Sequence, residues 1–267
     1  MKLSTSELRN AAYASIKGQW WQAIGIIICL NFLSAQTGKL SFPFSLLLSI
    51  FIVPFIWSVA VLFLRNYREK TNLLKNKTIY SEAYKDFVRI ILTMLLCSIY
   101  SIAWSLLFIL PFAIIFGGIL GYLASSGVKV PLWSGVFVVL GLLPAIPMII
   151  RYVLTAYILN DYPELKNNGA IDLSKAMMKN NRMSLVKAIW PYALIYICVS
   201  ILAGCFVVLL PQLKASGSFD NILWFLLILC ASIPFALWAQ VCLYNTLAVF
   251  YEQAKLEFEG SVSTNIQ

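Results

Sequence analysis

Long uncharged apolar runs dominate this sequence and restrict the folds open to it. A helix crossing a hydrocarbon core of about 30 Å needs roughly 20 apolar residues at about 1.5 Å each. Six such runs occur, and 61% of the chain is hydrophobic while only 12% is charged, which is unusual for a soluble protein. We predict an all-α polytopic membrane protein with six transmembrane helices in three hairpins. The predicted spans are residues 20–37, 42–64, 90–123, 131–159, 188–210 and 222–251.

The third apolar run is longer than one crossing requires. Residues 90–128 contain no charge, and as one continuous helix they would extend for about 58 Å, nearly twice the bilayer core. Two crossings here would leave short halves and place the later basic loops outside. We therefore expect one crossing, with a bend or break near Pro111 or Gly117–Gly118.

The distribution of cations indicates the orientation. Of the 20 Lys and Arg residues, all but Lys39, Lys129 and Lys214 lie in or close to four segments. Because Lys and Arg are retained in cytoplasmic loops, both termini should be cytoplasmic, and the membrane should be the cytoplasmic (inner) membrane of a bacterium. The predicted cytoplasmic segments are residues 1–18, 65–89, 160–187 and 252–267.

A short amphipathic segment with basic residues precedes each odd-numbered span. In the first, Ser4 and Glu7 have the spacing of a capping box, and Leu8, Ala12 and Ile16 share one helical face. Similar patterns occur over residues 80–89 and 169–182. We interpret the chain as three units, each an amphipathic helix at the membrane surface followed by a transmembrane hairpin.

Two short motifs resemble a known family. Residues 157–164 have the sequence Tyr-Ile-Leu-Asn-Asp-Tyr-Pro-Glu, and residues 174–179 have the sequence Ser-Lys-Ala-Met-Met-Lys. These motifs are similar to those of the bacterial integral-membrane family called domain of unknown function 975. The resemblance covers most of the chain and implies an uncharacterised multi-pass bacterial membrane protein. It implies no reaction.

Signals of enzymatic activity are mostly absent from the sequence. The chain contains no histidine, which excludes Ser-His and Cys-His catalysis and the H-E-x-x-H zinc motif. The 11 acidic residues all lie at the ends of the chain or in predicted loops. We therefore predict that the protein is not an enzyme and has no catalytic, cofactor-binding or metal-binding residues.

Candidate contact residues lie at the predicted cytoplasmic surface. Arg151 is the one cation within apolar sequence; we favour a side chain that reaches the headgroups, with an internal ligand or ion pair as the alternative. Asp161 and Glu164 fit a helix boundary, with contact to a partner or headgroup amine as the alternative. The residues expected to contact headgroups or partners are Arg9, Lys17, Arg151, Asp161, Glu164, Lys175 and Lys179.

Three functional hypotheses from different classes remain, and an intramembrane enzyme is the least supported of them. The first is non-enzymatic organisation of lipids, with anionic headgroups as partners, or of membrane-protein partners, including a second copy of the chain. The alternative is a small permease with a path near Arg151 and the polar residues of span six. The net charge of +9 does not indicate nucleic acid, because the cations flank apolar spans, as expected beside anionic lipid. The polar residues of the alternative path are Gln240, Tyr244, Asn245 and Thr246, with Asn31 in span one.

Overall fold

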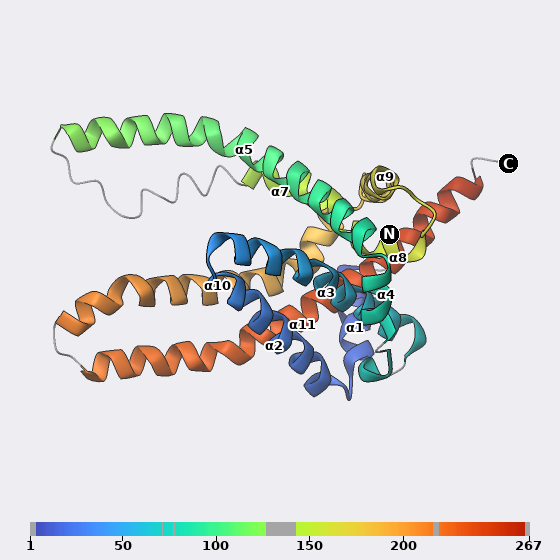
Figure 1. Cartoon of the computed structure of the whole chain (residues 1–267), viewed down its shortest axis with the longest axis horizontal. Helices are drawn as coiled ribbons and strands as arrows, with labels where there is room; N and C mark the ends of the chain where they lie inside the picture. The colour runs from blue at the N-terminus through green and yellow to red at the C-terminus, as the bar shows by residue number, and fades with distance from the viewer. Residues whose placement is uncertain (1–3, 71, 77, 127–142, 216–218, 265–267) are drawn as a thin grey trace. The chain divides into compact units, whose positions relative to one another are not determined.

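The protein is known from a computed structural model that describes residues 4–70, 72–76, 78–126, 143–215 and 219–264. Every regular element in this part of the chain is helical (Figure 1), which confirms the all-α prediction. The α-helices are α1 (Thr5–Ile16), α2 (Trp20–Thr37), α3 (Phe42–Glu69), α4 (Thr78–Lys85), α5 (Phe87–Ser125), α7 (Ile146–Ile149), α8 (Thr155–Asp161), α9 (Asn167–Met177), α10 (Arg182–Ala215) and α11 (Phe219–Thr264). The 3₁₀ helices are η1 (Leu73–Asn76), η3 (Leu143–Ala145) and η4 (Ile150–Tyr152).

Four described helices are long and apolar enough to cross a membrane, as expected of a multi-pass membrane protein. The helix α2 coincides with predicted span one, but it has only 18 residues and includes Gln22, Asn31 and Gln36. Part of predicted span four, residues 131–142, lies outside the described residues. The four candidate spans are Phe42–Glu69, Phe87–Ile119, Arg182–Leu202 and Leu226–Gly260.

The helix α5 contains most of the long third run. It has 39 residues and includes Pro111. The helical assignment continues through Pro111 and through Gly117–Gly118, so no break occurs at either place. A proline removes one backbone donor, while the hydrogen bonds on either side of it can still hold a helix together.

Residues 143–161 depart from the single long helix predicted for span four. The described part of that span is divided into η3, α7, η4 and α8, each seven residues or shorter. Pro144 and Pro147 lie in the first two of these pieces. Because proline lacks an amide hydrogen and its ring collides with the preceding turn, two prolines three residues apart disfavour a regular helix here.

The described residues divide into two compact units. The first contains the described residues of Met1–Asp86 and Met183–Gln267, and the second is Phe87–Arg182. In the first unit α3 contacts α2, α4 and α11. Trp57 to Leu64 are accordingly buried at every position, rather than on a single face of α3.

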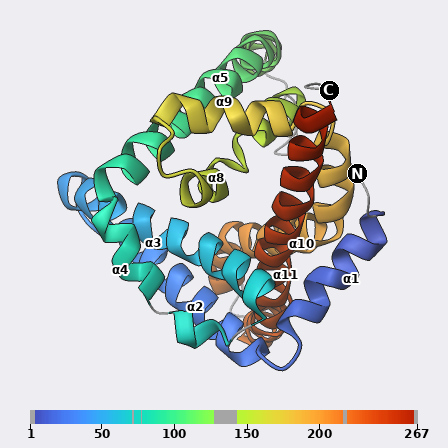
Figure 2. The same cartoon turned by 90° about the vertical axis from the view of Figure 1, so that its right-hand side faces the viewer.

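Within the first unit, α1 packs along α11 (Figure 2). The predicted capping box is present at Ser4 and Glu7. The predicted apolar face is also confirmed, since Leu8, Ala12 and Ile16 are at most 2% exposed. That face contacts protein, whereas we expected it to lie in the lipid surface.

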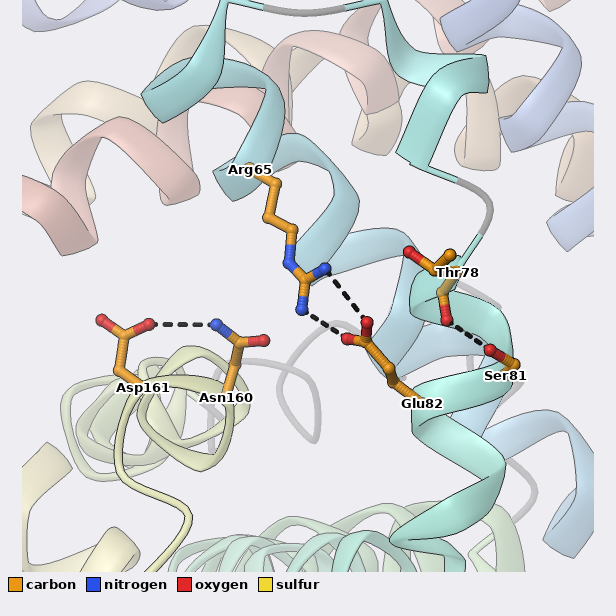
Figure 3. A network of polar contacts seen from close by, with 6 residues as sticks. All are labelled: Arg65, Thr78, Ser81, Glu82, Asn160 and Asp161. Carbon is orange, nitrogen blue, oxygen red and sulfur yellow. Dashed lines mark hydrogen bonds and ion pairs between the residues drawn. The ribbon is translucent and has the colours of Figure 1, made fainter.

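The helix α4 docks on α3 in the same way. Ile79 and Ala83 are fully buried, and Tyr80 stacks on Phe55 with ring centroids 5.4 Å apart. Both guanidinium Nη atoms of Arg65 donate to the carboxylate of Glu82, at 3.4 and 2.5 Å (Figure 3). The ion pair orients α4 on α3.

In the second unit, α9 contacts α5 and α8. Its buried side chains include Ala170, Ile171 and Met177. The apolar faces of the first and third predicted amphipathic segments are thus covered by other helices, while the second is covered only in part, since Tyr84 and Val88 are exposed. A helix that packs on protein and one that lies in lipid need the same apolar periodicity, so the sequence did not distinguish the two environments.

Candidate functional site

The segment from α8 to α9 is bonded to Arg89 of α5 and contains three of the seven predicted contact residues, Asp161, Glu164 and Lys175. One Nη atom of Arg89 donates to the carbonyl oxygens of Leu159, at 3.3 Å, and Tyr162, at 2.8 Å. The last carbonyls of a helix have no partner within the helix. Arg89 supplies donors to these acceptors at the end of α8 and so stabilises the turn toward α9.

A cluster of aromatic rings surrounds one cation on α9. The Lys175 Nζ atom lies 5.4 Å from the ring centroid of Tyr100 and 5.8 Å from that of Tyr152. The two rings are stacked, with their centroids also 5.8 Å apart. Trp104 donates its indole hydrogen to the Tyr152 hydroxyl at 3.1 Å. We name Tyr100, Trp104, Tyr152, Asp172 and Lys175 the cation–aromatic cluster.

Asp172 pairs with the lysine of this cluster. Lys175 Nζ donates to an Asp172 carboxylate oxygen at 2.9 Å. This hydrogen bond raises the pKa of Lys175 above its ordinary value, although partial burial acts in the opposite direction. A lysine is protonated at neutral pH even at its ordinary pKa, and the bond to Asp172 holds its cationic ammonium group near the tyrosine rings.

Arg151 lies in η4, immediately before Tyr152 of the cluster. The Ser174 hydroxyl donates to the Arg151 carbonyl oxygen at 2.7 Å, which ties η4 to α9. The Arg151 side chain is partly exposed, and its Nε atom is buried without a hydrogen-bond partner among the described residues. This contact between η4 and α9 thus involves the main chain of Arg151 rather than its guanidinium.

The turn before α9 forms one side of an open pocket of about 560 Å³. Arg89 and Lys166 bring positive charge to it, and Glu164 brings negative charge. Such a mixed lining suits a zwitterionic or amide-bearing group as well as it suits an anion. The pocket lining includes Arg89, Pro163, Glu164, Lys166, Asn167 and Asn168.

Asp161, Glu164 and Lys179 occupy simpler positions in the second unit. An Asp161 carboxylate oxygen accepts from the Asn160 side-chain amide at 3.0 Å, next to it at the end of α8 (Figure 3). Glu164 lies before α9 and Lys179 lies after it, and both side chains are exposed. Asp161 thus lies at the helix boundary predicted for it.

Arg9 and Lys17 belong to α1 and therefore to the first unit. The Arg9 Nε atom donates to the Thr5 carbonyl oxygen at 3.3 Å. Lys17 caps the end of α1 and is exposed. The structure thus brings Arg151 and Lys175 together through the Ser174 bond, while Arg9 and Lys17 lie on another helix.

Two of the polar residues of predicted span six, Gln240 and Asn245, bond to neighbouring helices of the first unit, while the Thr246 hydroxyl is buried without a hydrogen-bond partner among the described residues. The Asn245 amide donates to the Ala12 carbonyl oxygen and, at 2.7 Å, to the Ser15 hydroxyl. Gln240 exchanges hydrogen bonds with Asn31 at 2.9 and 3.3 Å. These contacts are the interhelical bonds commonly made by polar groups within membranes.

Several residues of the site were not predicted from the sequence. Tyr100 and Trp104 are four residues apart on α5, which places them on one helical face. Asp172 and Lys175 are three residues apart on α9, the spacing of an intrahelical ion pair. These local patterns indicate one face of α5 and one face of α9. They do not indicate that the two faces meet, because the residues in contact are about seventy positions apart in the sequence. In the described part of the chain, no three Cys, Asp or Glu side chains gather in a metal-binding arrangement.

Comparison with known proteins gives a family. A family model described as "Protein of unknown function (DUF975)" matches residues 1–256 of the chain. The match includes α8 and α9, where the resemblance was most specific, and it confirms that resemblance. No curated protein and no solved structure matches the chain.

Proposed function

We propose a function for this chain from the starting point that it belongs to the family described as Protein of unknown function (DUF975), a description that gives no activity. The protein is a non-enzymatic component of the bacterial cytoplasmic membrane that contacts anionic lipid headgroups at the inner leaflet. The observation that carries this proposal is the cation–aromatic cluster, in which a protonated lysine lies over two tyrosine rings beside a tryptophan.

The proposal includes six spans and cytoplasmic termini. The four long apolar helices would be joined in the membrane by α2 and by the predicted fourth span, residues 131–159. The excess of Lys and Arg on one side of these spans supports a cytoplasmic location for α1, α4 and α9. Because their apolar faces pack on other helices, these three segments would present their polar faces to the headgroups.

The chemistry of the cluster fits the headgroup level of a bilayer. Because α5 has 39 residues and a crossing needs about 20, the proposal has the third span begin near Trp104 rather than at residue 90, which puts Tyr100, Trp104 and Lys175 at the headgroup level. Trp and Tyr are enriched there because each ring has an apolar body and a polar edge. A cation near an anionic leaflet contributes about 1 kcal/mol of binding free energy. Lys175 is oriented by the tyrosine rings, and Lys179 lies four residues farther on and is exposed.

Lipid selectivity tests this proposal. The wild-type protein and the Lys175→Gln/Lys179→Gln variant would be purified in mixed micelles of phosphatidylcholine and phosphatidylglycerol, and bound lipid would be measured by native mass spectrometry. We expect the preference for phosphatidylglycerol to fall by about 25-fold, since two cations are lost and each corresponds to about fivefold. The matched control is Lys39→Gln, an exposed cation on the predicted outer side. Equal preference in all three proteins would refute the headgroup contact.

A second candidate function, a small permease, is favoured by residues 143–161. Short helical pieces within an otherwise long apolar segment occur in transporters, where the free backbone groups bind substrate. The interhelical bonds of Gln240 and Asn245 argue against a path along span six, because those side chains already have partners.

Flux through proteoliposomes distinguishes the two functions. Purified protein would be reconstituted into vesicles loaded with small ions and polar dyes, with empty vesicles as the control. Lipid contact alone predicts equal leakage in both preparations. Protein-dependent flux that Arg151→Leu abolishes would favour the permease.

A further inference from the structure

A groove in the first unit lies apart from the cation–aromatic cluster. Its volume is about 670 Å³, and residues of α2, α3, η1 and α4 form its walls. The lining is almost entirely apolar, and none of its described residues is acidic. The lining includes Trp21, Gly25, Leu33, Phe55, Leu74 and Tyr80.

The groove follows one stripe of α2. Trp21, Gly25, Cys29 and Leu33 all line it, and they are spaced four residues apart, so they share a helical face. From Trp21 to Leu33 the helix rises about 18 Å. One leaflet of the hydrocarbon core is about 15 Å thick, half of the full core. The groove therefore has the length of one lipid tail.

Gly25 widens the middle of the groove. A Cβ atom at this position would have no heavy atom within 4 Å. The volume corresponds to roughly twenty water-sized groups at about 30 Å³ each, and methylene groups are of similar size. A peptide helix of about 10 Å diameter and the same length would occupy roughly twice that volume. The dimensions favour an acyl chain over a helix.

Two lysines lie close in sequence to the Trp21 end of the groove, although neither lines it: Lys75 follows the lining residue Leu74, and Lys17 lies four residues before Trp21. Trp21 is 86% exposed there, as expected of an aromatic side chain at the headgroup level. The Gln19 side-chain carbonyl accepts from the Leu73 backbone amide at 2.8 Å, which joins the start of α2 to η1. Lys17 lies two residues before Gln19, and Lys75 lies two residues after Leu73. Both lysines are exposed.

We propose that this groove binds one acyl chain of an anionic phospholipid from the inner leaflet, with the lipid phosphate at Lys17 and Lys75. The inference rests on the membrane orientation proposed above, because the Trp21 end of the groove must face the cytoplasm. It does not depend on the cation–aromatic cluster, which is formed by other helices. The ligand is therefore a lipid held at a defined position, in addition to the lipids that surround any membrane protein.

Photo-crosslinking tests the position. The full-length protein would be reconstituted with phosphatidylglycerol carrying a diazirine on its acyl chain, and crosslinked peptides would be mapped by mass spectrometry. We expect crosslinks concentrated between Trp21 and Leu33 and at Phe55. Unlabelled phosphatidylglycerol should compete for these sites, whereas phosphatidylcholine should not. Crosslinks spread evenly over α2, α5 and α10 would mean that only surrounding lipid is detected, and would overturn the proposal.

Paired variants separate the tail site from the headgroup site. Gly25→Leu places a side chain in the groove and should abolish the α2 crosslinks; its control is Gly117→Leu on α5, where the space is also open. Lys17→Gln/Lys75→Gln should reduce crosslinking by about 25-fold, since two cations are lost at about fivefold each, and Lys39→Gln should leave it unchanged. Equal competition by phosphatidylcholine, or no effect of the Lys17/Lys75 variant, would contradict the anionic specificity. If lipid selectivity is lost in the Lys175/Lys179 variant while its α2 crosslinks persist, the result supports the proposed function and shows that the groove binds lipid independently of the cation–aromatic cluster.

Discussion

Arg89 is the side chain on which the α8–α9 segment most depends. Its guanidinium donates to two carbonyl oxygens at the end of α8. Hydrogen bonds to charged groups contribute about 1.5–3 kcal/mol each when a partner is otherwise left unsatisfied. Arginine is suited to this role because several donors lie in one plane, whereas lysine has a single ammonium group.

We expect Arg89→Gln to destabilise the second unit by about 2 kcal/mol, because the carbonyls of Leu159 and Tyr162 lose a charged donor. Hydrogen exchange of residues 155–168 in detergent should become faster. The control is Lys85→Gln, since Lys85 is exposed at the end of α4. Unchanged exchange in Arg89→Gln would show that the turn does not need this anchor.

Glu7 makes the stability of α1 depend on pH. The Ser4 backbone and side chain bond to its carboxylate and lower the pKa of Glu7 below its ordinary value. A lowered folded-state pKa stabilises the fold above the unfolded-state pKa of about 4.3, and this contribution disappears as the pH falls through the folded-state value. The Glu7→Gln variant should therefore have a lower melting temperature than the wild type at pH 7. At strongly acidic pH the two proteins should have the same melting temperature. A melting difference that does not change with pH would contradict the capping-box assignment.

Arg151 distinguishes a headgroup-directed side chain from an internal ligand. Because Ser174 bonds to its carbonyl, we expect Arg151→Lys to change stability by less than about 0.5 kcal/mol, while Arg151→Leu weakens anchoring at the membrane surface. Thermal melting in detergent compares the two. Equal losses would indicate that the planar guanidinium is required, as an internal ligand would be.

At the scale of elements, α1 is fastened to α11 by side chains as well as by its apolar face. Asn245 of α11 donates to Ala12 and Ser15 of α1, and Asn66 of α3 donates to the Ser15 carbonyl oxygen at 3.1 Å. An unsatisfied polar group within a membrane protein is costly, so these bonds specify one position of α1.

Asn245→Leu should release α1 from this position. We expect a loss of about 1–2 kcal/mol and faster protease cleavage within residues 4–16. Asn10→Leu is the matched control, because Asn10 lies on the exposed side of α1. Cleavage at equal rates in both variants would mean that the apolar face alone holds the helix.

The sequence predicted those elements whose signals are local. The capping box gave the start of α1, and the Trp20 boundary gave the start of α2. One crossing was predicted over residues 90–123, with a bend or break near Pro111 or Gly117–Gly118. That α5 has no break there could not be predicted, because whether Pro111 breaks a helix depends on its surroundings. The packing of α1, α4 and α9 on other helices was also missed, since their periodicity records an apolar face but not what covers it. The contact of Lys175 with Tyr100 is likewise long-range and has no local signature.

At the scale of the whole molecule, the central claim is that the chain crosses the membrane several times with both termini in the cytoplasm. It rests on the distribution of Lys and Arg and on the length of the apolar helices. All but three of the 20 Lys and Arg residues lie on one side of the predicted spans, which indicates cytoplasmic termini. The four candidate spans are consistent with a multi-pass membrane protein. The headgroup contact and the lipid groove both require that Lys17, Lys75 and Lys175 face the cytoplasm.

Single-cysteine labelling in intact cells tests this claim most directly. In a cysteine-free background, a membrane-impermeant maleimide would be applied to Lys39→Cys, Lys75→Cys and Lys179→Cys, before and after the membrane is permeabilised. The account predicts that Lys39→Cys reacts in intact cells and that the other two react only after permeabilisation. Labelling of Lys75→Cys or Lys179→Cys in intact cells would contradict the orientation and both proposals that rest on it.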